Sequence, residues 1–270
     1  MKKVLFLGYG DIAHQSAQLL TAGQWQVVGA CRQPERKPAL PNVELVSADA
    51  NSETDLRELL AQNFDAIVIT LTPASIDRDG YHQGYVVPCR HLQHLLYQHP
   101  HPPQIIYVSS TQVYGHRHGE WVDESSPTKP TTASGEMLLQ AEQVLLGSPA
   151  KVTILRCAGI YGPGRERLSN LIQSGRATLT LAWTNHIHSA DIAGFIVYLL
   201  EHQEHQGKVY VVSDHQPLPQ AEVYQRIAAQ LGLTTAHLPR SAEVGPRGSK
   251  RLRNDAMRAT GYRFIYPTRF

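Results

Sequence analysis

Seven short apolar runs alternate with amphipathic segments along the chain, and this alternation restricts the fold more than any other feature. Continuous Val, Ile and Leu are typical of parallel strands buried on both faces, and the segments between them have helical periodicity. The sequence therefore predicts an α/β fold built on a doubly wound parallel sheet of about seven strands. The expected strands lie within residues 4–8, 25–32, 43–49, 65–73, 104–110, 151–159 and 207–214.

Two parts of the chain differ in composition. Residues 1–161 and 186–216 carry the strand and helix alternation and are expected to form the sheet domain. Residues 162–185 and 217–270 are richer in Pro, Gly and Arg, with one clear helix at 220–232. Because ligands bind at the carboxyl ends of the strands in open α/β sheets, we interpret this second part as a small discontinuous substrate-binding lobe over that edge.

Composition excludes several classes of partner. The formal net charge is +2 and 18% of residues are charged, as in an ordinary globular protein, so we expect no nucleic-acid partner. The first apolar run has about five residues, fewer than the ~7 to 15 of a signal-peptide core or the ~20 of a membrane span. We therefore expect a cytoplasmic protein with no membrane partner.

Neither cysteine nor histidine spacing favours a structural cross-link. The three cysteines are far apart, which predicts reduced thiols rather than disulfides. His91 and His94 have the i, i+3 spacing that can share a metal on one helix face. Many of the fourteen histidines fall beside prolines, glutamines and helix ends, however, so we expect no metal site.

A glycine pattern, GYGDIA at 8–13, ends the first strand and opens the first helix, which is expected within residues 11–23. Gly8 permits a tight turn, Gly10 lets the backbone approach a pyrophosphate, and Ala13 lets the helix lie close to the strand. The N–H groups at the helix start then face the phosphates. The pattern predicts a Rossmann dinucleotide site with contacts from Gly8, Gly10, Asp11 and Ile12.

The end of the second strand bears on cofactor choice. An NAD site usually places Asp or Glu there to bind the ribose 2′-hydroxyl, whereas this chain has Cys31 and Arg32, with Arg36 one turn later. Cations at this position favour a 2′-phosphate, so NADP(H) is expected over NAD(H). The alternative is that Arg32 is a solvated loop residue and Glu35 holds the ribose.

Several stretches, in order along nearly the whole chain, resemble the extended short-chain dehydrogenases/reductases, the NAD(P)-dependent epimerase/dehydratases. They are GYGDIA, SAD (47–49), YVSSTQVYG (107–115), LRCAGIYGPGR (155–165), IHSADIAGFIVYLL (187–200) and KRLRNDAMRATGYRFIYP (250–267). The resemblance implies that Asp49 contacts the adenine and that Cys157, Ala158 and Gly159 line the nicotinamide. We expect further cofactor contacts from Ala50, Leu71, Thr72, Pro73 and Ser109. The family also implies a homodimer that pairs through sheet helices, including the one at 135–147.

The chain departs from that family at its proton-transfer pair. The family keeps Tyr-x-x-x-Lys on the helix at 135–147, but here Ser134 and Leu138 stand in the matching positions. Serine is a poor proton donor near neutral pH and leucine cannot bind a ribose. This resembles the atypical subgroup of the family. The expected catalytic residues are Ser110, which aligns with the family's active serine, Tyr114 and Ser134; Tyr161, His186 and His188 are other proton-donor candidates.

Three functions remain open for such a chain. The first is oxidoreduction at a carbonyl or hydroxyl carbon of a small polar metabolite, with epimerase/dehydratase or aldehyde/ketone reductase chemistry implied by the resemblance. The second is a non-catalytic NADP(H)-binding redox sensor or regulatory protein, and the third is a scaffold or subunit. Substrate contacts are expected from Tyr161, Arg165, Asn185 and His188, and the basic loop at 246–253 favours an anionic substrate.

Overall fold

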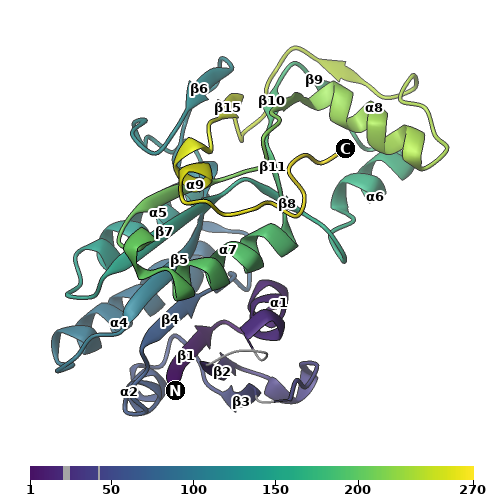
Figure 1. Cartoon of the computed structure of the whole chain (residues 1–270). Helices are drawn as coiled ribbons and strands as arrows, with labels where there is room; N and C mark the ends of the chain where they lie inside the picture. Colours follow the sequence, from purple (N-terminus) through teal and green to yellow (C-terminus); the bar gives the residue numbers. More distant parts are fainter. Residues whose placement is uncertain (21–24, 42) are drawn as a thin grey trace.

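The structure is a computed structural model that describes residues 1–20, 25–41 and 43–270. Within these ranges seven parallel strands form one sheet, in the order β12-β7-β5-β4-β1-β2-β3. The predicted α/β fold with a doubly wound sheet is confirmed (Figure 1). The strands are β1 (Lys2–Leu7), β2 (Trp25–Cys31), β3 (Val43–Ser47), β4 (Ala66–Ile69), β5 (Gln104–Ser110), β7 (Val152–Cys157) and β12 (Val209–Val212).

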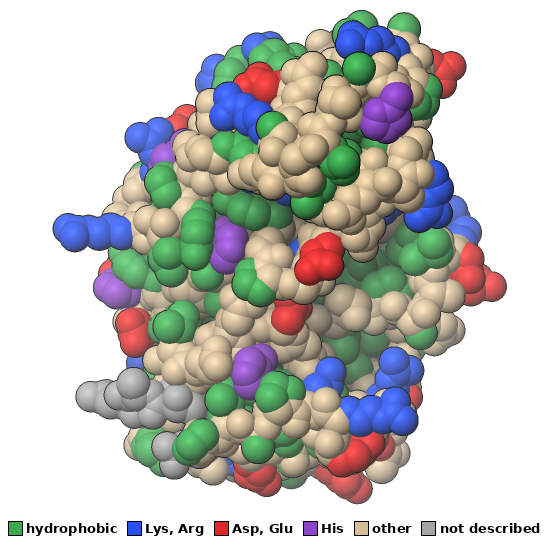
Figure 2. Space-filling model, turned by 90° about the vertical axis from the view of Figure 1, so that its right-hand side faces the viewer, with side chains coloured by type: hydrophobic (Ala, Val, Ile, Leu, Met, Phe, Trp, Pro, Cys, Tyr) green, Lys and Arg blue, Asp and Glu red, His purple; other side chains and the backbone are tan. Residues whose placement is uncertain are grey.

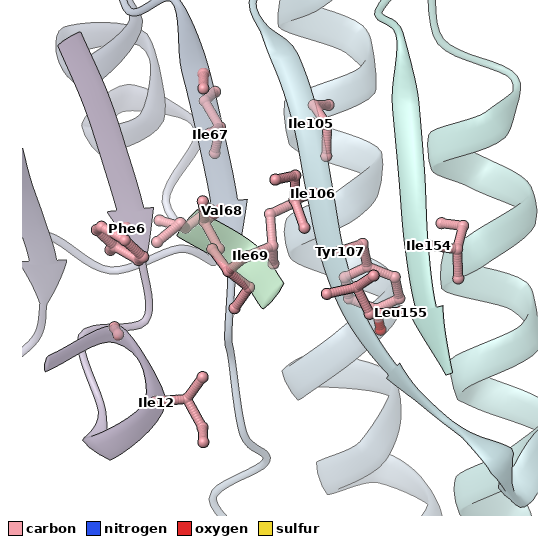
Figure 3. Close-up of a cluster of buried hydrophobic side chains, with 14 of the residues drawn as sticks. Phe6, Ile12, Ile67, Val68, Ile69, Ile105, Ile106, Tyr107, Ile154 and Leu155 are labelled. Carbon is pink, nitrogen blue, oxygen red and sulfur yellow. The ribbon is translucent and has the colours of Figure 1, made fainter. Parts of the chain in front are cut away.

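The central strands are buried on both faces, as their continuous apolar runs predict. Phe6 pairs with Val68, and Val68 pairs with Ile106, so β1, β4 and β5 stack their side chains in register. Figure 3 shows these side chains lying across neighbouring strands of the sheet, and Tyr107 of β5 pairs with Ile154 of β7. Burial of this continuous apolar surface is the main stabilising contribution to the sheet domain.

Helices cover both faces of the sheet (Figure 1). On one face α1 (Asp11–Leu20) packs against α7 (Ser189–Glu201). On the other, α4 (Val87–Tyr97) lies between α2 (Glu53–Leu60) and α5 (Ala133–Leu146). The last residues expected in the first helix, 21–23, lie outside the described residues. A short helix α3 (Arg78–Tyr81) and a π-helical turn (His82–Val86) precede α4 and were not predicted.

Short strands and helices build the region beyond the carboxyl edge of the sheet. Four two-stranded pairs occur in the described part of the chain: β8 (Gly159–Tyr161) with β11 (His186–His188), β9 (Leu179–Thr180) with β14 (Arg240–Ser241), β10 (Trp183–Thr184) with β13 (Leu218–Pro219), and β6 (Glu120–Val122) with β15 (Lys250–Leu252). The helices are α6 (Arg167–Gln173), α8 (Gln220–Gln230) and α9 (Asp255–Ala259). Short 3₁₀ turns occupy Pro34–Arg36, Thr111–Val113 and Gln203–His205.

A second hydrophobic core holds α6, α8 and β9 together, apart from the core of the sheet. Its buried members include Ile172, Leu179, Val223 and Ile227. By contrast Met257 of α9 belongs to the core of the sheet domain, although residues 217–270 were expected in the lobe. The boundaries between the sheet domain and the lobe stay a prediction. Across residues 1–20, 25–41 and 43–270, the structure contains no helix of the length and apolarity needed to cross a membrane.

Candidate functional site

A cleft of about 1550 Å³ runs along the carboxyl edge of the sheet, from the glycine turn to the region of α6 and α8. Figure 2 shows the surface hollowed between the upper and lower parts of the molecule. Cavities for a single small ligand span roughly 300–1,000 Å³. This cleft is therefore large enough for a dinucleotide together with a substrate.

The glycine turn between β1 and α1 forms one end of the cleft. Gly8 has a φ of 92°, and a Cβ atom there would lie 2.9 Å from the backbone nitrogen of Leu71. The N–H groups of Gly8 and Tyr9 donate to the carbonyl oxygen of Ala30, which fixes the turn. A Cβ atom at Gly10 would meet nothing closer than 3.9 Å, so the space before it is open. The turn fits a pyrophosphate approached by backbone N–H groups.

Cations gather where the second strand ends. Arg32, Arg36 and Lys37 all line the cleft, and Glu35 is not among the lining residues. None of these three cations forms an ion pair with a carboxylate in the described ranges. The other expected cofactor contacts that line this end are Gly8, Gly10, Asp11, Ile12, Cys31, Asp49, Ala50, Leu71 and Thr72.

Pro73, expected to touch the cofactor, does not line the cleft. A Cβ atom at Gly84 would lie 2.6 Å from the Cα atom of Pro73, so this proline is packed against the π-helical turn that precedes α4. Its neighbours Leu71 and Thr72 remain at the cleft surface. The loop after β4 therefore presents two of the three expected residues.

The middle of the cleft brings together β5, β7 and α5. Ser109, Ser110, Ser134, Leu138, Cys157, Ala158 and Gly159 all line it. The Ser110 side chain accepts a hydrogen bond from the N–H of Gln112 at 3.3 Å, so its own proton is free to point toward a ligand. Burial raises the pKa of the Cys157 thiol to about 12, which keeps it neutral.

Tyr114 is not brought to the cleft, contrary to its expected catalytic role. It is 2% exposed, and its hydroxyl oxygen accepts a hydrogen bond from Nη1 of Arg156 at 2.8 Å. Burial raises its pKa to about 12. Arg156 in turn forms a buried ion pair with Glu142 of α5, whose carboxylate also accepts a hydrogen bond from Ser109. The phenol of Tyr114 therefore completes a buried polar network that holds α5 on β5 and β7.

The four expected substrate residues have different surroundings. Tyr161 lines the cleft, and its hydroxyl donates to the carbonyl oxygen of Thr268 at 3.3 Å. Arg165 also lines it but forms an ion pair with Asp11 at 2.5 Å. Asn185 lies in the lining, yet its amide bonds the backbone of β15 on both sides, donating to Lys250 and accepting from Leu252. These three residues shape the cleft, and each has a protein partner, although Nε of Arg165 is buried without a hydrogen-bond partner among the described residues.

His188 does not line the cleft. Its Nδ1 atom accepts a hydrogen bond from the N–H of Ala190 and caps α7, and its ring stacks on Tyr266 at 3.7 Å between centroids. Burial lowers its pKa, so the ring is held neutral. Its neighbour His186 does reach the cleft, where burial lowers its pKa to about 3. A histidine this hard to protonate is unsuited to donate a proton near neutral pH.

The structure adds a group of cations at the lobe end of the cleft. Arg167, Arg247 and Lys250 line it, and no carboxylate pairs with any of them in the described part of the chain. Burial lowers the pKa of Arg247, and the positive charge of Arg167 lowers it further. Lys250 is 7% exposed, and its pKa is lowered to about 8 by burial, with Arg247 adding to the effect and Glu120 opposing it. We call these three side chains the cation group.

Sequence reasoning found this end of the cleft only in part. The basic loop at 246–253 contains two members of the cation group, but Arg167 lies about 80 residues earlier on α6. Tyr85 and Arg269 also line the cleft and were missed. No local pattern marks these residues, because tertiary packing alone brings them to one surface. Over the described residues no cluster of three or more His, Cys, Asp or Glu side chains could hold a metal ion.

Comparison with known proteins gives a consistent family assignment. Residues 8–203 match a family model described as NAD(P)H-binding. Protein YeeZ from Escherichia coli K12 is 31% identical over 251 residues, which covers 91% of this chain and 89% of that protein. The family model begins at the glycine turn and ends before the lobe residues 217–270, whereas the match to YeeZ covers 91% of the chain.

Solved structures share the whole architecture. A candidate NAD-dependent epimerase/dehydratase from Methylobacillus flagellatus is 33% identical, with a TM-score of 0.80 over 99% of this chain and 94% of that one. The dTDP-glucose 4,6-dehydratase from Bacillus anthracis, solved with NAD, has a TM-score of 0.81 over 98% and 92% of the two chains. At 17% identity, this second likeness shows the fold alone. The chain therefore belongs to the NAD(P)H-binding family, as an atypical short-chain dehydrogenase/reductase in which Ser134 and Leu138 stand where the family keeps tyrosine and lysine.

Proposed function

We propose that this protein is an NADP(H)-dependent oxidoreductase that acts on a carbonyl or hydroxyl carbon of a small anionic metabolite. One observation carries the proposal: the dinucleotide end, Ser110 and the cation group all line a single cleft. A cofactor and an anionic substrate that share this cleft would meet near Ser110. The relatives with printed activities, among them dTDP-glucose 4,6-dehydratase, belong to the same fold.

The cations at the end of β2 support NADP(H) over NAD(H). Arg32 and Arg36 reach the cleft without carboxylate partners in the described ranges, where an NAD site would place a carboxylate. A 2′-phosphate would form charge-assisted hydrogen bonds with these guanidinium groups. A carboxylate in their place would repel it.

The cation group supports an anionic substrate. In addition to burial, the charge of Arg167 lowers the pKa of Arg247, and the charge of Arg247 lowers that of Lys250. Lys250 is buried, so a bound anion would relieve both this repulsion and the lost hydration of the Lys250 ammonium. A phosphate or carboxylate group on the substrate meets this requirement.

The chemistry divides between the cofactor and the protein. Bound NADP(H) supplies or accepts the hydride. The hydroxyl of Ser110, which accepts a hydrogen bond from Gln112, would donate its own proton to the substrate oxygen, and the cation group would hold the anionic end of the substrate. Leu138 and Cys157 are apolar or neutral surfaces that keep water away from the reacting carbon.

Replacing Arg32 by aspartate is expected to reverse the cofactor preference. The substitution removes a cation from the 2′-phosphate and introduces a repelling charge, while a 2′-hydroxyl gains an acceptor. A hydrogen bond to a charged group contributes about 1.5–3 kcal/mol, so NADPH affinity should fall roughly 10- to 100-fold. The dissociation constants of NADPH and NADH, measured by cofactor fluorescence, give the ratio directly.

Arg263→Asp is the matched control, because Arg263 is exposed, lies outside the cleft lining and undergoes the same change of charge. Its NADPH to NADH ratio should equal that of the unaltered protein. An Arg32→Asp variant with an unchanged ratio would mean that the 2′-phosphate binds elsewhere.

A further inference from the structure

We propose that the hydroxyl of Tyr85 donates the proton to the substrate oxygen, in place of the tyrosine that α5 lacks. This role rests on the oxidoreductase function proposed above. Tyr85 lies in the π-helical turn His82–Val86, which packs directly against α5. It lines the same cleft as Ser110, Ser134 and Leu138.

Several contacts fix the turn that carries Tyr85. The close approach of Gly84 to Pro73 seats the turn on the loop after β4, which also carries Leu71 of the cofactor end. An ion pair of 2.8 Å between Arg78 and Glu136 joins the preceding helix α3 to α5. π-Helical turns within helices occur often at functional sites. The backbone of Tyr85 is thus held between the cofactor end of the cleft and α5.

The hydroxyl of Tyr85 differs from those of the other tyrosines that line the cleft. The hydroxyl of Tyr9 is 3.4 Å from Nδ1 of His14, that of Tyr161 donates to Thr268, and that of Tyr224 bonds with Gln220. Tyr85 makes no hydrogen bond to any described residue, and its oxygen is not among the fully buried polar atoms that lack partners. Its proton is therefore available to a ligand in the cleft.

The ring of Tyr85 is held by stacking. It lies parallel to the ring of Tyr81, with 6.2 Å between centroids and 5° between planes. Arg247 of the cation group lines the same cleft as Tyr85. A substrate whose anionic end lies at Arg247 would share this cleft with Tyr85 and Ser110.

The environment keeps Tyr85 in its protonated form. Burial, with a smaller contribution from Tyr81, raises its pKa to about 12, and Leu138 supplies no positive charge to lower it. At neutral pH the phenol is a proton donor and almost never a base. The phenol can therefore donate a proton during reduction of a carbonyl, although as a weaker acid than a tyrosine of ordinary pKa.

The proposed step balances as a carbonyl reduction. The substrate carbon receives a hydride from the reduced cofactor as the carbon–oxygen π bond breaks, and the oxygen takes the proton of Tyr85. The O–H bond of the alcohol forms as the O–H bond of the phenol breaks. Water in the cleft then returns a proton to the phenolate. One carbonyl, one NADPH and one proton become one alcohol and one NADP⁺.

The test compares Tyr85→Phe with Tyr81→Phe, which removes a hydroxyl from the stacked neighbour that does not line the cleft. NADPH deuterated at its transferable position is mixed with each protein and one metabolite extract, and deuterium incorporation is followed by mass spectrometry. Loss of general-acid help should slow incorporation about 10²- to 10⁴-fold in Tyr85→Phe. Tyr81→Phe should remain within a few-fold of the unaltered protein, and NADPH affinity should be unchanged in both.

A second readout does not depend on turnover. In protein labelled with 3-fluorotyrosine, the ¹⁹F resonance missing from the Tyr85→Phe spectrum identifies Tyr85, and it should shift when NADP⁺ binds. The resonance of the exposed Tyr97, outside the cleft, should not shift. Incorporation at the unaltered rate in Tyr85→Phe, or a Tyr85 resonance indifferent to NADP⁺, overturns the role of Tyr85 alone. Absence of incorporation with the unaltered protein overturns the oxidoreductase function, and this role with it.

Discussion

Replacing Glu142 by alanine is expected to lower the free energy of unfolding by about 3–5 kcal/mol, because it leaves the buried charge of Arg156 without a partner. Glu142 is 1% exposed and accepts hydrogen bonds from Nε and Nη2 of Arg156 and from Oγ of Ser109. Arg156 is 6% exposed and has the hydroxyl of Tyr114 as its other partner. Urea denaturation followed by circular dichroism measures the loss.

Two further variants separate the charge effect from general damage to the helix. Glu222→Ala breaks an exposed pair with Arg226, and such pairs contribute only about 0–1 kcal/mol. Replacing both buried partners, as in Glu142→Leu with Arg156→Met, should recover most of the stability, since no unpaired charge remains. A loss below about 1 kcal/mol for Glu142→Ala would show that the pair is not desolvated as the structure indicates.

Replacing Asp214 by asparagine is expected to stabilise the protein at pH 8, by about 2–4 kcal/mol. Asp214 is 2% exposed, and burial raises the pKa of its carboxyl group from 3.8 to about 7. Between pH 4 and pH 7 the unfolded chain has released this proton while the folded chain retains it. The free energy of unfolding of the unaltered protein therefore falls as pH rises through that range. Asparagine does not titrate, so the variant lacks this loss of stability.

The measurement is the free energy of unfolding of both proteins at pH values from 4 to 8. The difference between them should be small near pH 4 and should grow until about pH 7. Asp255→Asn is the matched control, because Asp255 is 74% exposed and the same carboxylate is replaced, so its effect on stability should stay within about 1 kcal/mol. A difference for Asp214→Asn that does not change with pH would contradict the buried, protonated carboxyl.

The sheet can be predicted from the sequence because its signals are local. Every residue of β7 is buried, and its segment VTILRC, mostly apolar, predicts a strand without knowledge of its neighbours. The turn at Gly8 is equally local, because a single glycine satisfies both the positive φ and the close approach of Leu71. The cofactor end of the cleft was therefore largely predictable.

The lobe end depends on contacts between distant segments, which a single sequence does not reveal. The strand pair β6 and β15 joins residues 120–122 to residues 250–252, and each strand has three residues, too few for a periodic pattern. Tyr114 and His188 illustrate the converse. Their residue types suggested chemistry, but Arg156 binds the phenol of Tyr114, and His188 caps a helix. Side-chain type alone cannot distinguish these roles from catalysis.

The most direct test of the central claim is hydride transfer itself. The protein, with saturating NADPH deuterated at the transferable position, is incubated with a small-metabolite extract, and mass spectrometry searches for a compound one mass unit heavier than in the unlabelled reaction. The account predicts a deuterated alcohol that carries a phosphate or carboxylate group, formed despite Ser134 and Leu138 in place of tyrosine and lysine. Bound NADPH with no deuterium in any metabolite would contradict it and favour a protein that binds the cofactor without turnover.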